Sequence, residues 1–328
     1  MAFRPLRWSL SVLLAVWTML VAAQDDDLKA IPLRTHSLQS PFLDSDMQSR
    51  WFDFGGTTVV RADQYVRLTT DHSSQAGWIF SRVPLTATNW EIEVEFAING
   101  AGHLFGDGMA MWVTKDRAEM GPVFGMKDRF EGLGIFFDTY KNNRPGVVFP
   151  YVMAMLGDGQ TSYDQANDGK ANELAGCSAR GIRNSDIATK VKVTYFQDKE
   201  LTVDLMYKQE DVWTRCFEVP NIKLPSVTYL GFSAETGELA DNHDIISIET
   251  KNLYSPSGRS ASAAGSKDYS RNKRKQKQSK QGGSWAWTIT KFFIFGALCA
   301  VGWVGFTRSE EHTSNSSHSG ESRMPSSA

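Results

Sequence analysis

Apolar and charged residues alternate over several short stretches of the chain. The run WEIEVEF at residues 90–96 places every second side chain on an apolar face. Residues 191–195 (VKVTY) and 201–205 (LTVDL) repeat this alternation on either side of a short polar turn. A period of two residues is typical of a strand with one face in water. We therefore predict three such strands, the last two joined as a hairpin.

Two other stretches, residues 108–113 (GMAMWV) and 133–137 (LGIFF), are apolar without alternation. Such runs are typical of strands that are covered on both faces. Long helical periodicity is missing between residues 36 and 254, a length that suits one all-β sandwich. We predict an all-β fold, a jelly-roll sandwich of two packed antiparallel sheets.

The N-terminus has the pattern of a secretory signal. Arg4 and Arg7 precede an apolar run at residues 8–21, and Ala22 and Ala23 are followed by polar residues. This order predicts a signal peptide at residues 1–23, cleaved after Ala23. The alternative is an uncleaved N-terminal anchor.

A second apolar segment, residues 285–307, is long enough to cross a bilayer as one C-terminal transmembrane helix. With a cleaved signal, residues 24–254 become a lumenal domain, residues 255–284 a basic Ser/Lys-rich stalk and residues 308–328 a cytosolic tail. Seven Lys and Arg residues between positions 267 and 280 precede the span and only Arg308 follows closely, a charge pattern that by itself favours the opposite orientation. We give the cleaved signal more weight.

The basic residues of the stalk suit either a solvated spacer, which we favour, or contact with anionic lipid or an acidic partner. The formal net charge of the whole chain is −2, and we expect no nucleic-acid partner. Of the three cysteines, Cys299 lies in the predicted span. Cys177 and Cys216 are left to form a disulfide in an oxidising lumen or, alternatively, to remain free thiols.

Polar residues gather in four segments next to predicted strands: residues 106–108, 138–142, 162–169 and 236–242. Their carboxylates, amides and carbonyls are the oxygen ligands that Ca²⁺ prefers. No His or Cys accompanies them, which argues against zinc. Spacing alone is a weak signal, because acidic loops are usually solvated.

Four motifs in these segments carry a resemblance to a known family. GDGMAMW at 106–112, GPVFG at 121–125, FDTY at 137–140 and DNHD at 241–244 resemble the L-type (leguminous-type) lectin cargo receptors of the early secretory pathway. The resemblance runs from about residue 36 to 254. It implies a concanavalin-like sandwich that binds high-mannose N-glycans beside Ca²⁺ and is not an enzyme. It also implies residence in the membranes of the ER, the intermediate compartment or the Golgi, with coat proteins reading the tail.

Carried onto this chain, the resemblance implies calcium ligands and sugar-binding positions at defined residues. The calcium ligands fall on Asp138, the Tyr140 carbonyl, Asn142 and Asp168. The sugar positions fall on Ser74, Asp107, Asn142, Gln165, Gly237, Glu238 and Leu239, with Tyr140 or Phe137 as a candidate aromatic face. The family disulfide maps onto Cys177 and Cys216.

The chain departs from the family pattern at three places. Gln165 stands where these receptors usually carry His, and Glu238 where they often carry Asp. The tail ends in Ser327-Ala328 and lacks the dilysine or terminal aromatic signal of a cycling receptor. These departures keep open a lectin-fold adaptor that has lost sugar binding and recognises protein cargo.

An enzyme is the other alternative, because Glu91, Glu93 and Glu95 share one face of a strand as the carboxylates of some β-glucanases do. The competing interpretation is a solvated outer face, and the two differ in whether the glutamates line a cleft. His243 likewise has two interpretations: a sensor of lumenal pH, or a loop histidine with a structural hydrogen bond, which we favour.

Overall fold

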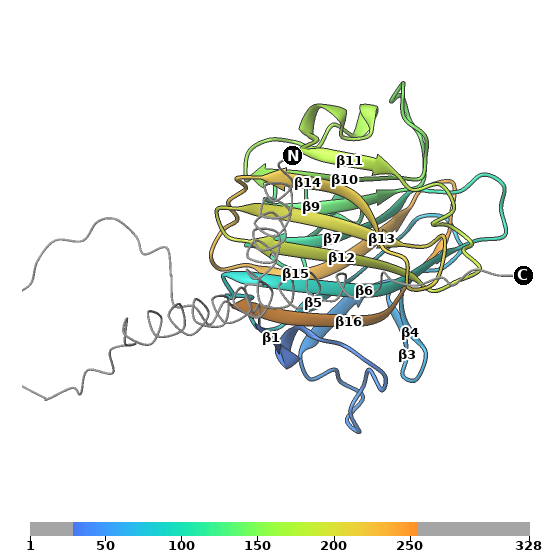
Figure 1. The fold of residues 1–328 in the computed structure, drawn as a ribbon. Helices are drawn as coiled ribbons and strands as arrows, with labels where there is room; N and C mark the ends of the chain where they lie inside the picture. Colours follow the sequence, from blue (N-terminus) through green and yellow to red (C-terminus); the bar gives the residue numbers. More distant parts are fainter. Residues whose placement is uncertain (1–28, 255–328) are drawn as a thin grey trace, which may run out of the picture. The chain divides into compact units, whose positions relative to one another are not determined.

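The computed structural model of the protein describes residues 29–254. Within this range sixteen strands account for nearly all regular structure, and the helices are three short 3-10 turns, η1 (Arg34–His36), η2 (Gln165–Asn167) and η3 (Lys170–Asn172). All strand pairings within the two sheets are antiparallel, and the sheets lie face to face (Figure 1). The predicted all-β sandwich is confirmed.

The first sheet follows the order β14 (Thr214–Pro220), β13 (Glu200–Met206), β12 (Thr189–Phe196), β6 (Asn89–Asn99), β16 (Asn242–Tyr254), β4 (Tyr65–Thr69) and β3 (Val59–Arg61), with β1 (Lys29–Pro32) also paired to β16. The second sheet follows the order β11 (Ala175–Ser178), β10 (Tyr151–Asp158), β9 (Glu131–Asp138), β7 (Gly108–Thr114), β15 (Tyr229–Thr236), β5 (Gln75–Ser81) and β2 (Phe52–Gly56). The short β8 (Met120–Val123) lies outside both sheets.

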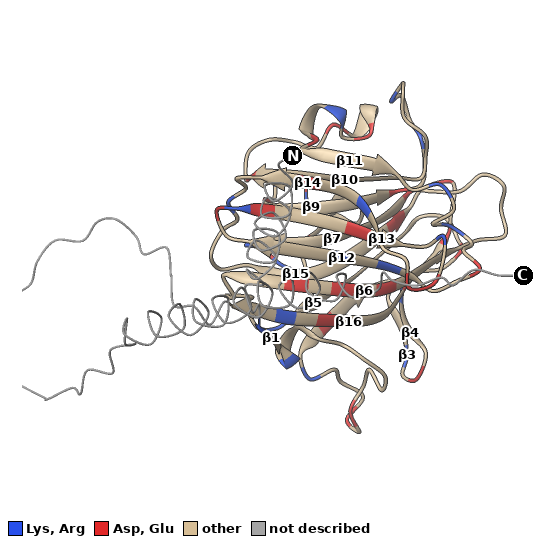
Figure 2. Cartoon of the chain, viewed as in Figure 1, with Lys and Arg blue, Asp and Glu red and all other residues tan. Residues whose placement is uncertain are grey.

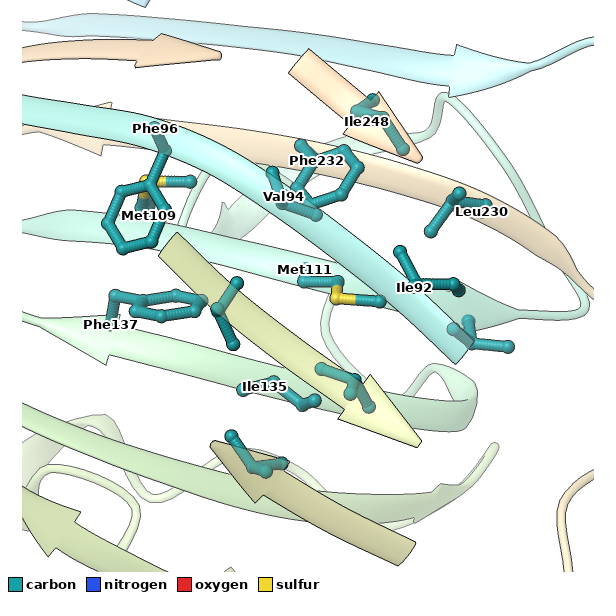
Figure 3. Packing of buried hydrophobic residues seen from close by; sticks show 14 of the residues in the cluster. Ile92, Val94, Phe96, Met109, Met111, Ile135, Phe137, Leu230, Phe232 and Ile248 are labelled. Carbon is teal, nitrogen blue, oxygen red and sulfur yellow. The ribbon is translucent and has the colours of Figure 1, made fainter. Parts of the chain in front are cut away.

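The strands predicted from alternation are β6, β12 and β13, and the hairpin of β12 with β13 is confirmed. On β6 the apolar side chains of Ile92, Val94 and Phe96 point into the space between the sheets (Figure 3). They meet residues such as Met111 and Phe232 of the second sheet, and burial of these apolar surfaces is the main force that holds the sandwich together.

The second sheet is covered on its other face as well. Every residue of β7 is buried; Met109 and Met111 belong to the core between the sheets, whereas Ala110 and Trp112 belong to a second apolar cluster. That cluster also contains Tyr163 and residues from the segments around β8 and η2. The uniformly apolar pattern of β7 and β9 therefore has the predicted cause, and the covering segments form the floor of the site described below.

The three glutamates of β6 lie on the outer face of the first sheet. Glu91 pairs with Lys251, and Glu93 pairs with Lys190 and Lys192. Figure 2 shows the acidic and basic positions alternating across β6, β12 and β16. The side chains thus form a solvated ladder of opposite charges, and they do not line a cleft.

A disulfide joins Cys177 of β11 to Cys216 of β14. These are edge strands of the two different sheets, so the bond closes one side of the sandwich. The predicted pairing is confirmed. Both sheets, both apolar clusters and the disulfide close within residues 29–254, which makes this segment a self-contained folding unit.

The predicted signal peptide, stalk, transmembrane span and tail lie outside the described residues. Within residues 29–254, no helix has the length and apolar character needed to cross a membrane.

His243 belongs to β16 and not to a loop, so its predicted location was wrong, whereas the structural hydrogen bond is present. Its Nδ1 lies 2.7 Å from Thr69 Oγ1. The Thr69 hydroxyl donates to the Asp241 carbonyl, so Nδ1 must carry the proton and donate to Thr69. The other ring nitrogen is buried without a partner among the described residues. Burial, together with the positive charge of Arg183, lowers the pKa of His243 to about 3.

This lowered pKa makes His243 a source of acid sensitivity and not a sensor of lumenal pH. The folded domain keeps the imidazole neutral, whereas the unfolded chain takes up a proton below about pH 6.5. The stability that this group contributes is complete above pH 6.5 and is lost as the pH falls toward 3. Between pH 6 and pH 5, this imidazole makes the free energy of unfolding of the native domain fall by up to about 1.4 kcal/mol per pH unit. We expect His243→Leu to lack this part of the pH dependence.

Urea denaturation of the variant and the native domain at pH 7, 6 and 5 measures this slope. The variant is expected to be less stable at pH 7, since it loses the hydrogen bond to Thr69. Equal slopes in the two proteins would contradict the assignment of a neutral, buried imidazole.

Candidate functional site

One end of the second sheet brings together segments that are far apart in the sequence. Gly108 of β7 pairs with Asp138 of β9 on one side and with Glu235 of β15 on the other. Thr236 of β15 in turn pairs with Gln75 of β5. The residues that precede β7 and β5 therefore meet the ends of β9 and β15 at one end of these inner strands.

A pocket of about 200 Å³ opens at this end of the second sheet. Six of the ten residues predicted to bind calcium or sugar line it: Asp107, Asp138, Tyr140, Asn142, Gln165 and Asp168. The remaining lining residues are Pro122, Val123, Phe124, Tyr163 and Glu235. The lining contains no His or Cys.

Asp138 and Asp168 are two carboxylates buried in the same pocket, with exposed fractions of 6% and 2%. Burial, followed by the negative charge of Asp168, raises the pKa of Asp138 well above its ordinary value. The backbone N–H of Tyr140 donates to Asp138 at 3.1 Å and acts in the opposite direction. Because like charges in a buried site repel each other, this pair favours uptake of a cation or a proton.

Asp168 is held by three donors from the segment that follows β9. It accepts the backbone N–H of Asn142 at 3.0 Å, the Asn142 side-chain amide at 2.7 Å and the backbone N–H of Arg144 at 3.2 Å. Since the Asn142 Nδ2 group is directed at a carboxylate, its Oδ1 is left as an acceptor for another group.

The hydroxyl of Tyr163 is buried in the same pocket without a hydrogen-bond partner among the described residues. The Tyr163 ring packs against Phe136 with centroids 4.9 Å apart, so the hydroxyl is fixed in place. Burial and the charges of Asp138 and Asp168 raise the pKa of this tyrosine. Buried polar groups almost always have a partner, and the site therefore has a place for one further polar ligand.

The donor set of the pocket fits a hard cation. It offers carboxylate, amide and carbonyl oxygens, which are calcium ligands, and no nitrogen or sulfur ligand from His or Cys. Nowhere in residues 29–254 do three His, Cys, Asp or Glu side chains gather as a metal-binding group. The expected calcium shell does not need such a group, since only two of its four residues are carboxylates.

Asp107 immediately precedes Gly108, the first residue of β7, and is half-buried. Burial raises its pKa, while the backbone N–H of Gly237 stabilises its charge. A side chain at position 237 would place its first carbon 3.1 Å from Asp107 Oδ2, so the glycine permits this close approach. The Asp107 carbonyl accepts the backbone N–H of Thr139 at 3.0 Å, which ties the residue to the end of β9.

The other predicted sugar positions surround Asp107 without lining the pocket. The backbone N–H of Ser74 donates to the Gly237 carbonyl at 2.9 Å and links these two loops. Glu238 is exposed, and Leu239 packs near Gly106. Ser74, Gly237 and Leu239 thus lie near Gly106 and Asp107, and none of the four residues lines the pocket.

Gln165 is partly committed to the protein. Its Nε2 donates to the Pro122 carbonyl at 2.8 Å. A carbonyl can only accept, which fixes the orientation of the amide and leaves Oε1 as its acceptor. This side chain can therefore accept from a ligand and tie η2 to the segment of β8.

Sequence reasoning gave no role to the five other lining residues. Pro122, Val123 and Phe124 lie in the GPVFG motif, and Tyr163 lies in a segment noted for its polar residues. Glu235 is the one charged residue in the apolar strand β15, a signal that was available. It accepts the backbone N–H of Gly125 at 3.0 Å, and burial raises its pKa.

Comparison with known proteins agrees with this geometry. The profile of the Legume-like lectin family matches residues 30–259. The chain belongs to the legume-like lectin family. Its legume-lectin fold, with two antiparallel sheets and a site at one end of the second sheet, is the one described above.

Two curated members of the legume-like lectin family illustrate the similarity. The chain is 44% identical over 221 residues to vesicular integral-membrane protein VIP36 of Mus musculus, covering 66% of this chain and 61% of the mouse protein. It is 42% identical over 219 residues to L-type lectin-like domain-containing protein C126.08c of Schizosaccharomyces pombe, covering 66% of this chain and 70% of the yeast protein. The match thus spans less than two thirds of the mouse relative.

Solved structures of the legume-like lectin family match the same segment. The VIP36 exoplasmic/lumenal domain in its Ca²⁺/Man2-bound form has a TM-score of 0.64 and 43% identity, covering 68% of this chain and 89% of that domain. A Ca²⁺/Man3GlcNAc-bound form and a metal-free form of the VIP36 domain match with TM-scores of 0.63 and 0.65, each at 42% identity. The carbohydrate recognition domain of Emp47p, at 19% identity and a TM-score of 0.57, supports the fold alone.

The two buried carboxylates should respond oppositely to neutralisation in metal-free buffer. Asp138→Asn removes the repulsion with Asp168, so we expect the melting temperature in EDTA to rise by roughly 2–4 °C. Asp168→Asn replaces one of the two carboxylate oxygens that together accept three N–H donors, so we expect the free energy of unfolding to fall by about 1–3 kcal/mol. Calorimetry of both variants of residues 24–254 tests this. A fall in melting temperature for Asp138→Asn would show that the carboxylate pair carries no repulsion.

Proposed function

We propose that this protein is a calcium-dependent mannose-binding lectin that acts as a receptor for high-mannose glycoproteins in the early secretory pathway. The observation that carries the proposal is the arrangement of the pocket. A buried cluster of oxygen ligands around Asp138 and Asp168 lies beside the half-buried carboxylate of Asp107, at one end of the second sheet. The solved VIP36 domain, a relative at 43% identity, binds Ca²⁺ and mannose oligomers.

The calcium ligands in this proposal are Asp138, the carbonyl of Tyr140, Asn142 and Asp168. Bound there, calcium neutralises the repulsion between the two carboxylates and fixes the Asn142 amide. The fit is supported by the raised pKa of Asp138, by the free Oδ1 of Asn142 and by the unpartnered Tyr163 hydroxyl.

The sugar lies against Asp107 in this proposal. The Asp107 carboxylate accepts two neighbouring sugar hydroxyls. The backbone N–H of the adjacent Gly237 favours the charged form of this carboxylate, and the missing side chain at position 237 leaves room beside it. Asn142 and Gln165 Oε1 contact the same sugar from across the pocket, and the Tyr140 ring offers an apolar face. Ser74, Glu238 and Leu239 complete the rim, and the last two contribute backbone groups, so that Glu in place of Asp at position 238 is tolerated.

The remaining parts of the proposal concern membrane attachment. A cleaved signal at residues 1–23, a stalk at 255–284 and one span at 285–307 place the lectin domain, residues 24–254, in the lumen. The tail at 308–328 faces the cytosol, where coat proteins can read it. The relative VIP36 is named a vesicular integral-membrane protein, which supports an ER, intermediate-compartment or Golgi location.

Calorimetric titration of residues 24–254 with a high-mannose oligosaccharide, first with calcium and then with EDTA, tests the proposed function. We expect binding heat only with calcium. Asp107→Asn and Asn142→Ala each remove hydrogen bonds to the sugar and are expected to weaken binding at least about tenfold. Glu93→Gln, which changes a glutamate on the outer face of the other sheet, is the matched control and is expected to bind normally.

The outcomes separate the candidate functions. Binding that survives EDTA, or that survives both pocket substitutions, would refute the site assignment. A folded domain that gives no heat in either buffer would favour the adaptor that recognises protein cargo. The family is a family of lectins and not of enzymes, and the glutamates that motivated a hydrolase lie on the outer face of the other sheet, paired with lysines.

A further inference from the structure

Arg144 is a buried cation beside the proposed calcium site, and no role has been given to it so far. Its side chain is 4% exposed. It follows the proposed ligand Asn142 by two residues, yet it does not line the pocket. Burying a guanidinium group is costly unless its charge and its N–H groups are satisfied, so its contacts indicate what it holds in place.

Arg144 holds Asp168 by both its side chain and its main chain. The backbone N–H of Arg144 donates to Asp168 Oδ2 at 3.2 Å, and the guanidinium Nη1 donates to the Asp168 carbonyl at 3.1 Å. Asp168 has a left-handed backbone, with φ 50° and ψ 47°, which is uncommon for a residue with a side chain. A single residue thus fixes this conformation from two directions.

The other side of the guanidinium is anchored to the second sheet. Arg144 pairs with Glu173, whose second oxygen accepts the hydroxyl of Tyr151 at 2.7 Å. The guanidinium carbon lies 4.4 Å from the centre of the Tyr151 ring, and Nη1 lies 3.5 Å from the sulfur of Met153. Tyr151 and Met153 belong to β10. We call Arg144, Glu173 and Tyr151 the clamp.

The clamp opposes the repulsion that the site itself creates. Without a cation, Asp138 and Asp168 are two carboxylates buried in one pocket that repel each other. Asp138 is the last residue of β9, whereas Asp168 lies between β10 and β11, outside both sheets, so the repulsion acts mainly on the segment of Asp168. Glu173 offsets the charge of Arg144, so the two carboxylates still present a net negative charge to a cation.

Resting on the proposed function, we propose that Arg144 is a positioning residue which, with Glu173 and Tyr151, holds Asp168 in its ligand geometry before calcium binds. Because the loop that carries Asp168 is already ordered, calcium binding loses little conformational entropy, and the calcium affinity of the site is higher. The sugar contacts are separate from the clamp. Its loss should therefore lower calcium affinity while leaving sugar affinity unchanged once the site is saturated with calcium.

Calcium titration of residues 24–254 carrying Arg144→Met tests this proposal. Loss of a residue that orients a metal ligand is expected to lower calcium affinity about 10- to 100-fold. Mannose affinity at saturating calcium is expected to stay within about twofold, since the contacts to sugar remain. Arg144→Lys keeps the charge without the forked geometry and is expected to recover part of the loss. Glu173→Gln is a milder change and is expected to lower calcium affinity less. It replaces Arg144→Met in this test if that variant folds poorly.

Arg67→Met is the matched control. Arg67 makes a partly buried, two-pronged pair with Asp244, with both contacts at 2.7 Å, in the other sheet. Its loss should lower stability and leave calcium affinity unchanged. If Arg144 served only the stability of the fold, the two variants would behave alike.

Hydrogen exchange in EDTA tests the clamp without calcium. The backbone amides of residues 142 and 144 both donate to Asp168, and we expect them to be protected in the native domain and to lose protection in Arg144→Met. Unprotected amides in the native domain, or native calcium affinity in Arg144→Met, would overturn the proposal. A native domain that binds no calcium would instead contradict the proposed function, and the protection of these amides distinguishes the two failures.

Discussion

Asp138 and Asp168 are buried in one pocket, and the cost of holding two like charges together organises everything around them. The pKa of Asp138 is raised, Asn142 and Arg144 direct three donors at Asp168, and the Tyr163 hydroxyl remains without a partner. A site of this kind is less stable than its surroundings until a cation enters. Functional sites often keep such unfavourable arrangements because their ligand relieves them.

The fold supplies the rigidity that this arrangement needs. Asp138 ends a strand that is buried on both faces, because one apolar cluster fills the sandwich and a second covers the outer side of the second sheet. The segments that cover this second cluster also contribute Phe124 and Tyr163 to the pocket. The same loops thus contribute apolar side chains to the core and polar groups to the site, so the packing of the core also holds the site in place.

Some of this could be predicted from the sequence. Alternation revealed β6, β12 and β13, because only a half-exposed strand produces a period of two, and uniform apolarity revealed β7 and β9. Six of the ten site residues implied by the family resemblance line the pocket, whereas the polar loops alone gave only a weak signal for a calcium site. The order of the strands, which places β7 between β9 and β15, depends on non-local pairing and left no local pattern. Glu235, the commitment of Gln165 to Pro122 and the contacts of Arg144 depend on that order, so they required the structure.

We propose above all that a calcium ion and a mannose residue share the pocket at one end of the second sheet. Anomalous X-ray diffraction from crystals of residues 24–254, grown with calcium and a mannose disaccharide, tests it most directly. The account predicts an anomalous peak between the carboxylates of Asp138 and Asp168, with sugar density against Asp107. A peak elsewhere, or sugar bound away from Asp107, would contradict it.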